Sequence, residues 1–203
     1  MYALEDVEKL SSIVRALLLL SQAESGQLVL QRSVLDLGEL AAEVVDQFQI
    51  PAEEKGLSLT VLCDEGTRAL VDRTQMERLL SNLLSNAIKY TPKGGHVNVR
   101  VGMDPERPEW ARLVVEDTGV GIAPEDLPHI FDRFYRVRNV QTNKIEGLGL
   151  GLSFVSWIVS AHGGELHVES TPGKGSRFEI RLPAAPSAAA HPSAEPATES
   201  VPS

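Results

Sequence analysis

The chain has 203 residues, 42% of them hydrophobic and 23% charged, with a formal net charge of −9 at neutral pH. Such a composition is typical of a globular protein with one core, and the negative charge argues against a general nucleic-acid-binding surface. The single Cys63 excludes an intrachain disulfide and fits a reducing compartment, and no apolar run is long enough to span a membrane.

The first 26 residues predict an amphipathic helix that forms a separate unit. Val7, Leu10, Val14 and Leu17 are spaced three, four and three residues apart, which makes a heptad-like seam. An isolated helix does not expose so much apolar surface. We therefore expect this helix to pack on another helix or on a copy of itself.

Residues 27–183 predict an α+β fold, a two-layer sandwich in which a mixed sheet carries helices on one face. The tail, residues 184–203, is rich in Ala, Pro and Ser and is predicted to be disordered. The predicted helices are Leu35–Gly56, Met76–Thr91 and a third helix that follows Gly147–Gly151 and ends at Ala161. The predicted strands are Leu57–Cys63, Ala69–Val71, His96–Val101, Leu113–Glu116, Glu165–Ser170 and Ser176–Leu182.

Polar residues interrupt the apolar stripe of the helix predicted at Met76–Thr91. Asn82 and Asn86 lie four residues apart, and Lys89 and Tyr90 follow one turn later. Asn is a mediocre helix former, so two on one stripe indicate a polar partner. The Asn86 carbonyl suits a hard cation such as Mg²⁺, and Lys89 is placed for phosphate. An amphipathic helix with a merely polar edge is the alternative.

The strand that ends in Asp117 leads directly into Gly119 and Gly121. Glycines permit positive φ and let a ligand approach the backbone closely. The Asp117 carboxylate can accept a hydrogen bond from a flat donor such as an exocyclic amine. An ordinary turn gives the same pattern, so this segment indicates a binding site only together with the other motifs.

A second glycine-rich segment, Gly147–Gly151, runs directly into an apolar helical pattern. Glycines before a helix N-terminus expose N–H groups to phosphate. The polar segment Arg136–Glu146 precedes them where a dinucleotide fold would have a strand, so we predict a flexible phosphate-covering lid. Phe131 and Phe134 are expected to anchor one end of this lid while an arginine meets phosphate. A short amphipathic helix is the alternative.

Taken in order, these motifs resemble the catalytic, ATP-binding part of bacterial two-component sensor histidine kinases. This family belongs to a superfamily that includes gyrase, heat-shock chaperone and mismatch-repair ATPases. The likeness spans roughly Leu37 to Leu182. It rests on an N-box at Asn82–Gly95, a first glycine box at Asp117–Ile122, an F-box at Ile130–Arg136 and a second glycine box at Gly147–Ser153.

The resemblance implies ATP and Mg²⁺ as cofactors. Asp117 would bind the adenine amine and Asn86 would ligate Mg²⁺. Lys89 and Arg136 would contact phosphates, and together with Asn82 and Asn86 they are the predicted catalytic residues. The full set of predicted ATP-binding residues is Asn86, Lys89, Tyr90, Asp117, Gly119, Gly121, Ile122, Phe131, Phe134, Gly147, Leu148, Gly149, Leu150 and Gly151.

Asn82 separates the enzyme classes within the superfamily. ATP-hydrolysing members, and serine kinases that inhibit sigma factors, carry at this position a glutamate that serves as general base. Asn82 cannot take a proton, whereas a neutral imidazole needs little activation. The residue therefore favours phosphoryl transfer to histidine over hydrolysis, although Glu77 and Glu116 lie nearby in the sequence.

The phosphoacceptor histidine of this family lies in the first helix of a dimerisation hairpin. The present sequence has no histidine before His96, and residues 1–26 resemble only the second hairpin helix. We predict an ATP-dependent protein-histidine kinase that lacks its acceptor histidine. Its partners would be the histidine of a dimerisation hairpin, a downstream response regulator and, in the full-length protein, a second copy. A cytoplasmic location is expected, as a cytosolic protein or as the cytosolic part of a membrane-bound sensor.

Two alternatives to this function remain. The chain could be a non-catalytic module that binds ATP or only dimerises, because intact binding motifs do not demonstrate transfer. It could also be an ATP hydrolase of the same superfamily, which Asn82 disfavours.

Overall fold

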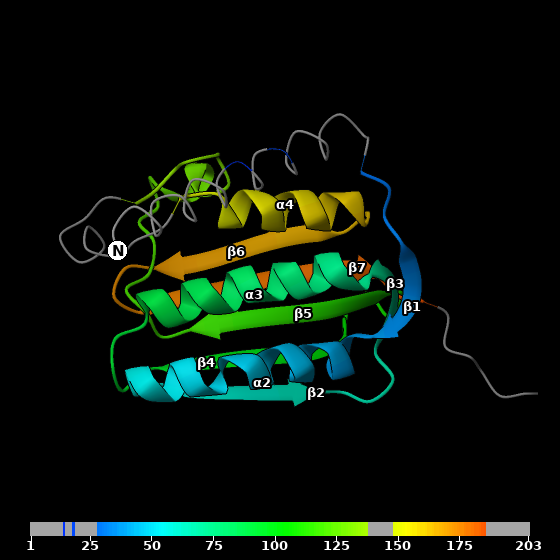
Figure 1. The fold of residues 1–203 in the computed structure, drawn as a ribbon, viewed down its shortest axis with the longest axis horizontal. Helices are drawn as coiled ribbons and strands as arrows, with labels where there is room; N and C mark the ends of the chain where they lie inside the picture. Colours follow the sequence, from blue (N-terminus) through cyan, green and yellow to red (C-terminus); the bar gives the residue numbers. More distant parts are fainter. Residues whose placement is uncertain (1–13, 15–17, 19–27, 138–147, 186–203) are drawn as a thin grey trace, which may run out of the picture.

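The computed structural model describes residues 28–137 and 148–185, together with Val14 and Leu18. In this part of the chain a five-stranded mixed sheet carries three helices on one face (Figure 1), which confirms the predicted α+β sandwich. In chain order the elements are β1 (Arg32–Asp36), α2 (Leu37–Lys55), β2 (Ser58–Cys63), β3 (Arg68–Asp72), α3 (Arg73–Tyr90), β4 (His96–Met103), β5 (Trp110–Asp117), a 3₁₀ turn (Leu127–His129), α4 (Gly151–Ala161), β6 (Glu165–Thr171) and β7 (Gly175–Pro183).

The strand order of the large sheet is β2-β4-β5-β7-β6. Strands β2 and β4 are parallel, and every other neighbouring pair is antiparallel. Asp117 closes the central strand β5, opposite Val97 of β4 on one side and Ser176 of β7 on the other. The topology therefore puts the carboxylate singled out in the sequence at the end of the middle strand, between two neighbours.

Strand β1 was not predicted from the sequence. Its residues are mostly exposed, so the pattern of apolar residues is weak, and the strand forms because it pairs antiparallel with β3. Arg32 lies opposite Asp72, and Asp36 lies opposite Arg68. Asp36 also begins α2, because its side chain accepts a hydrogen bond of 2.9 Å from the N–H of Gly38.

Three predicted segments lie largely outside the described residues. They are the helix predicted at residues 1–26, the lid predicted at Arg136–Glu146, of which only Arg136 and Val137 are described, and the tail predicted at residues 184–203, of which only Ala184 and Ala185 are described. Of the N-terminal helix only Val14 and Leu18 are described. Both are helical, and 53% and 57% of their surfaces are exposed.

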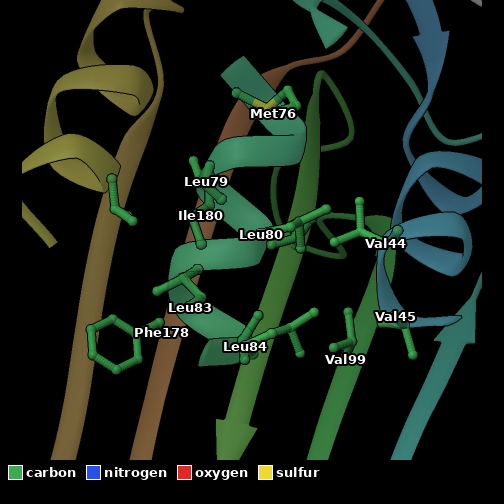
Figure 2. Packing of buried hydrophobic residues seen from close by; sticks show 14 of the residues in the cluster. Val44, Val45, Met76, Leu79, Leu80, Leu83, Leu84, Val99, Phe178 and Ile180 are labelled. Carbon is green, nitrogen blue, oxygen red and sulfur yellow. The ribbon is translucent and has the colours of Figure 1, made fainter. Parts of the chain in front are cut away.

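Helix α3 lies between α2 and α4 and holds the centre of the core. Its leucines are almost completely buried, and Figure 2 shows Leu79 and Leu83 beside Ile180 and Phe178 of β7. Burying a leucine side chain stabilises the fold by about 1.5–3 kcal/mol. This packing fixes the rotation of α3 about its axis, and so it decides which way the polar residues of the same helix point.

The core role of α3 can be tested with Leu83→Ala. Because Leu83 is 1% exposed, its truncation leaves a cavity and should lower the free energy of unfolding by about 2–5 kcal/mol, measured by urea denaturation. Leu62→Ala is the matched control, since Leu62 is 65% exposed and its loss should cost less than about 0.5 kcal/mol. Similar losses for the two variants would contradict the packing described here.

Candidate functional site

A cavity of about 420 Å³ lies beside α3, where the end of β5, the start of β7 and the start of α4 come together. Its volume is typical of small-molecule sites. Most of the residues that the sequence predicted line it. They are Asn82, Asn86, Lys89, Tyr90, Asp117, Gly121, Ile122, Arg136, Leu148, Gly149, Leu150 and Gly151.

Four predicted site residues are not on the described wall of the cavity. Gly119 and Phe131 are absent from the lining, and Phe131 packs instead against the hydrophobic core. Phe134 is 54% exposed and has a positive φ of 63°. Gly147 lies outside the described residues. The structure thus places both phenylalanines of the F-box away from the cavity, one toward the core and one toward solvent.

Asp117 is a buried acid on the cavity wall, with 8% of its surface exposed. Burial raises the pKa of its carboxyl group, and hydrogen bonds from the backbone N–H groups of Gly119 and Ser176 oppose that rise. The bond from Gly119 to Oδ1 is 2.8 Å long. Asp117 is thus held in one orientation and is well suited to accept a hydrogen bond from a ligand.

The glycine loop that follows β5, residues 118–122, is fastened to two neighbours. The N–H of Val120 donates to the carbonyl of Tyr90 at the end of α3, at 3.1 Å. Val120 also accepts from the N–H of Gly173, in the β6–β7 turn, at 2.7 Å. The N–H of Ile122 donates to Oγ of Ser170 in β6 at 2.8 Å. These bonds hold the loop rigidly between the helix and the hairpin.

The glycines of this loop are required by its own packing. Gly121 has a φ of +69°, and a Cβ there would lie 2.1 Å from the carbonyl oxygen of Thr171. A Cβ on Gly119 would lie 2.6 Å from Oδ1 of Asp117 and 2.7 Å from the carbonyl oxygen of Tyr90. The sequence pattern suggested that these glycines admit a ligand. The structure adds that they also let three pieces of backbone meet.

Another part of the cavity wall is the N-terminus of α4. This helix has no side-chain cap and no acidic residue in its first turn, so its N–H groups and positive dipole end are suited to an anion. Gly149 precedes it with a φ of +68°, and its carbonyl accepts from the N–H of Phe134 at 2.9 Å. A Cβ on Gly151 would lie 3.1 Å from Oδ1 of Asn82. The start of α4 therefore rests directly on the asparagine of α3.

Arg78 is a cavity-lining cation that sequence analysis missed. Its guanidinium lies 3.8 Å from the ring centroid of Phe154 in α4, a cation–π contact, and burial lowers its pKa. Arg78 precedes Asn82 by four residues, so the helical spacing that selected the asparagines would also have selected Arg78. The other lining residues missed were Ser85, Ala87, Val120, Ile130, Tyr135, Val137, Leu152, Phe154, Ser176 and Phe178.

The donor set of the described residues limits how a metal could be held. No group of three or more His, Cys, Asp or Glu side chains gathers for a metal in residues 28–137 and 148–185. Asn86 lines the cavity and supplies one side-chain oxygen. A Mg²⁺ ion held by one protein oxygen, ligand phosphates and water fits this arrangement, since Mg²⁺ retains several waters.

The sequence matches a family model described as histidine kinase-, DNA gyrase B-, and HSP90-like ATPase, over residues 71–186. The chain belongs to this family. It is 40% identical over 181 residues to the sensor histidine kinase CusS of Escherichia coli K12, a match that covers 89% of this chain and 37% of CusS. It is 33% identical over 178 residues to the sensor histidine kinase WalK of Bacillus subtilis, covering 88% of this chain and 29% of WalK. The chain therefore spans about a third of the length of these relatives.

Solved structures of histidine kinases show the same fold. Full-length ShkA in complex with AMPPNP superposes with a TM-score of 0.77 at 29% identity, covering 89% of this chain and 37% of ShkA. The Acinetobacter baumannii histidine kinase AdeS superposes with a TM-score of 0.71 at 28% identity, covering 89% of this chain and 81% of AdeS. The chain is thus a histidine kinase-type ATP-binding catalytic domain. Among its described helices, none has the length and apolarity needed to cross a bilayer.

The packing requirement of the glycine loop can be tested with Gly121→Ala. The new Cβ would suffer both an unfavourable φ, worth about 1–2 kcal/mol, and a clash with the Thr171 carbonyl. Gly173→Ala is the matched control, because Gly173 has a φ of +76° but its Cβ would have no atom within 4 Å. Urea denaturation should show a clearly larger loss for Gly121→Ala. Equal losses would mean that φ strain alone explains why position 121 requires a glycine.

Proposed function

We propose that the cavity binds ATP together with Mg²⁺ and that the domain transfers the γ-phosphate to a histidine. The observation that carries the proposal is the excess of cationic over anionic side chains among the residues that line the cavity. Its described lining contains Arg78, Lys89 and Arg136 but only one carboxylate, that of Asp117, although the whole chain has a net charge of −9. A local excess of cations beside a helix N-terminus suits a polyphosphate.

Each wall would hold a different part of the nucleotide. Asp117, oriented by Gly119 and buried, would accept a hydrogen bond from the adenine amine. The phosphates would lie toward Lys89, Arg136 and the N-terminus of α4. When bound through Asn86, Mg²⁺ would neutralise charge on the phosphate oxygens. Phosphoryl transfer depends mainly on such positioning and charge neutralisation.

The lack of a suitable general base among Asn82, Glu77 and Glu116 favours histidine as the phosphate acceptor. Asn82 has no basic atom, and Glu77 and Glu116 are not among the described lining residues. Glu77 instead pairs with Arg73, at 2.8 Å between Oε1 and Nε. A neutral imidazole attacks phosphorus without a strong base, whereas water or a hydroxyl requires one. This arrangement supports phosphoryl transfer to histidine and disfavours hydrolysis.

The acceptor and the partners follow from the relatives. CusS and WalK are named sensor histidine kinases, and this chain matches about a third of each. We infer that the acceptor histidine belongs to a dimerisation hairpin, that the full-length protein is a homodimer, and that a response regulator receives the phosphate. Residues 1–26 would supply one hairpin helix.

The nucleotide assignment can be tested with Asp117→Asn. Loss of the charged acceptor should weaken binding of Mg-ATP by about 1.5–3 kcal/mol, or roughly tenfold to 150-fold in Kd, measured by titration calorimetry. Asp46→Asn, at an exposed position of α2, serves as the control and should bind like the wild type. Equal affinity of all three proteins, or no binding by the wild type, would overturn the assignment.

The transfer step can be tested with Asn86→Ala and labelled ATP. The wild type should phosphorylate a separately added dimerisation-hairpin fragment, slowly because the two are not linked. Asn86→Ala should abolish the labelling through loss of the proposed metal ligand. Asn98→Ala is the control, since the Asn98 side chain accepts a hydrogen bond from Thr60 and does not line the cavity.

The same assay separates the kinase from its alternatives. The chain alone should form no base-stable, acid-labile phosphohistidine. Labelling of His96, His129 or His162 in the isolated chain would contradict the proposal. Tight binding of Mg-ATP without labelling of any hairpin would favour the non-catalytic module, and steady release of inorganic phosphate would favour the hydrolase.

A further inference from the structure

Helices α3 and α4 contact each other at three positions, and the order of these positions along α4 is the reverse of their order along α3. Gly151 of α4 rests on Asn82, and the Phe154 ring carries the Arg78 guanidinium. At the far end His162, directly after α4, is bonded to Asp72, the N-cap of α3. At about 1.5 Å per residue, the outer two contacts lie roughly 16 Å apart along α4 and roughly 15 Å apart along α3. The two helices are therefore antiparallel and fastened at both ends.

At the far contact one buried imidazole makes two directional hydrogen bonds, one across to Asp72 and one back to Ile158 within α4. Nε2 of His162 lies 3.0 Å from the backbone N of Asp72, and Nδ1 lies 2.7 Å from the carbonyl oxygen of Ile158. A backbone N–H can only donate and a carbonyl can only accept. The ring must therefore be neutral, with its proton on Nδ1. His162 is 5% exposed, so water does not compete for either bond.

We propose that His162 is a positioning residue that sets the register of α4 against α3, and thereby the placement of the Gly149–Gly151 backbone against Asn82 at the nucleotide cavity. This inference rests on the proposed function, in which the N-terminus of α4 binds phosphate. The histidine itself is not among the residues that line the cavity.

The three contacts differ in how strongly they resist sliding of one helix along the other. The stack of Arg78 on Phe154 has a flat interface, and such a contact tolerates small shifts. Hydrogen bonds weaken steeply when distance and angle change, so the His162 link defines one position. At the cavity end a Cβ on Gly151 would lie only 3.1 Å from Asn82. A small slip of α4 would consequently change the contact there.

Protonation offers a way to release this link without a mutation. Two charged groups are close enough to act on the ring electrostatically, Arg32 of β1 and Asp72 at the end of β3. Burial lowers the pKa of His162, the bond to Ile158 and the Asp72 charge oppose this shift, and the Arg32 charge adds to it. The native state therefore binds the proton less readily than the unfolded chain, so the link is intact above the ordinary histidine pKa of about 6.5. It is lost as the pH falls through the lowered native value.

The start of β1 and the residue before it are hydrogen-bonded to the same place, where the end of α4 meets the start of α3. The N–H of Gln31 donates to Oδ2 of Asp72 at 2.8 Å, and Nη2 of Arg32 donates to the carbonyl of Ala161 at 2.5 Å. Asp72 is the residue whose backbone N–H donates to His162, and Ala161 directly precedes His162. The point that fixes the register of α4 is thus also the point where β1 is attached to the two helices beside the nucleotide cavity.

The experiment compares His162→Phe, which keeps a ring but removes both nitrogens, with His162→Gln, whose amide can both accept and donate. His167→Phe is the control, because His167 lies in β6 with 56% of its side chain exposed. Titration calorimetry with Mg-ATP is run well below each melting temperature. His162→Phe should raise Kd by roughly threefold to tenfold, and His162→Gln should return it to within about twofold of the wild type.

Two readouts separate positioning from mere stability. Between pH 8 and pH 5 the wild type should lose affinity faster than His162→Gln. This difference isolates the histidine, because the terminal phosphate of ATP titrates equally in both titrations. Amide hydrogen exchange without nucleotide should be faster at residues 148–154 in His162→Phe than in the wild type. That measurement does not depend on nucleotide binding, so it tests the register even if the proposed function fails.

The proposal is overturned if His162→Phe lowers the melting temperature but leaves the Kd, its pH profile and exchange at residues 148–154 unchanged. If the wild type does not bind Mg-ATP, the proposed function fails, and the exchange data alone decide the register. If His162→Phe does not fold, the pH dependence of exchange in the wild type and in His162→Gln decides instead, and identical profiles would overturn the inference.

Discussion

Helix α3 must satisfy two environments at once, and the rest of the domain is arranged around it. One face carries leucines such as Leu80 and Leu84, both fully buried between α2 and the sheet. The other face carries Asn82 and Asn86 on the cavity wall. Because the leucines fix the rotation of the helix, the direction of the polar groups follows from core packing and requires no separate support. Burial of the leucines thus determines where Asn82 and Asn86 lie.

The cavity walls depend on close contacts between backbone segments. Besides the contacts of the Asp117–Ile122 loop, a Cβ on Gly175 would lie 1.9 Å from the carbonyl oxygen of Asp117, so the start of β7 packs directly on the end of β5. A Cβ on Gly149 would lie 2.7 Å from Phe134. Glycine-rich motifs of this kind are commonly interpreted as ligand-approach sites. In this domain they serve equally to bring the elements of the wall together.

Electrostatics within the domain is local and does not follow the overall charge. A chain with a net charge of −9 has three cations and one carboxylate on the described wall of its cavity. The long-range field would repel a polyanion, but it is screened over about 8–10 Å at physiological ionic strength. In the proposed complex, short-range contacts with cationic side chains and with the N-terminus of α4 would therefore dominate the binding of a polyphosphate.

The sequence by itself determined the parts of this protein that depend on local periodicity. The four-residue spacing of Asn82 and Asn86 places both on one helical face, and the glycine loop that contains Gly119 and Gly121 directly follows a strand. That these elements line one cavity was expected only from the resemblance of the ordered motifs to a known family. The outward direction of Phe134, the pairing of β1 with β3, and the bond of His162 to Asp72 were decided only by the tertiary structure. Local patterns specify which face of an element is apolar. They do not specify which distant backbone group meets a given side chain, because that depends on how whole elements pack against one another.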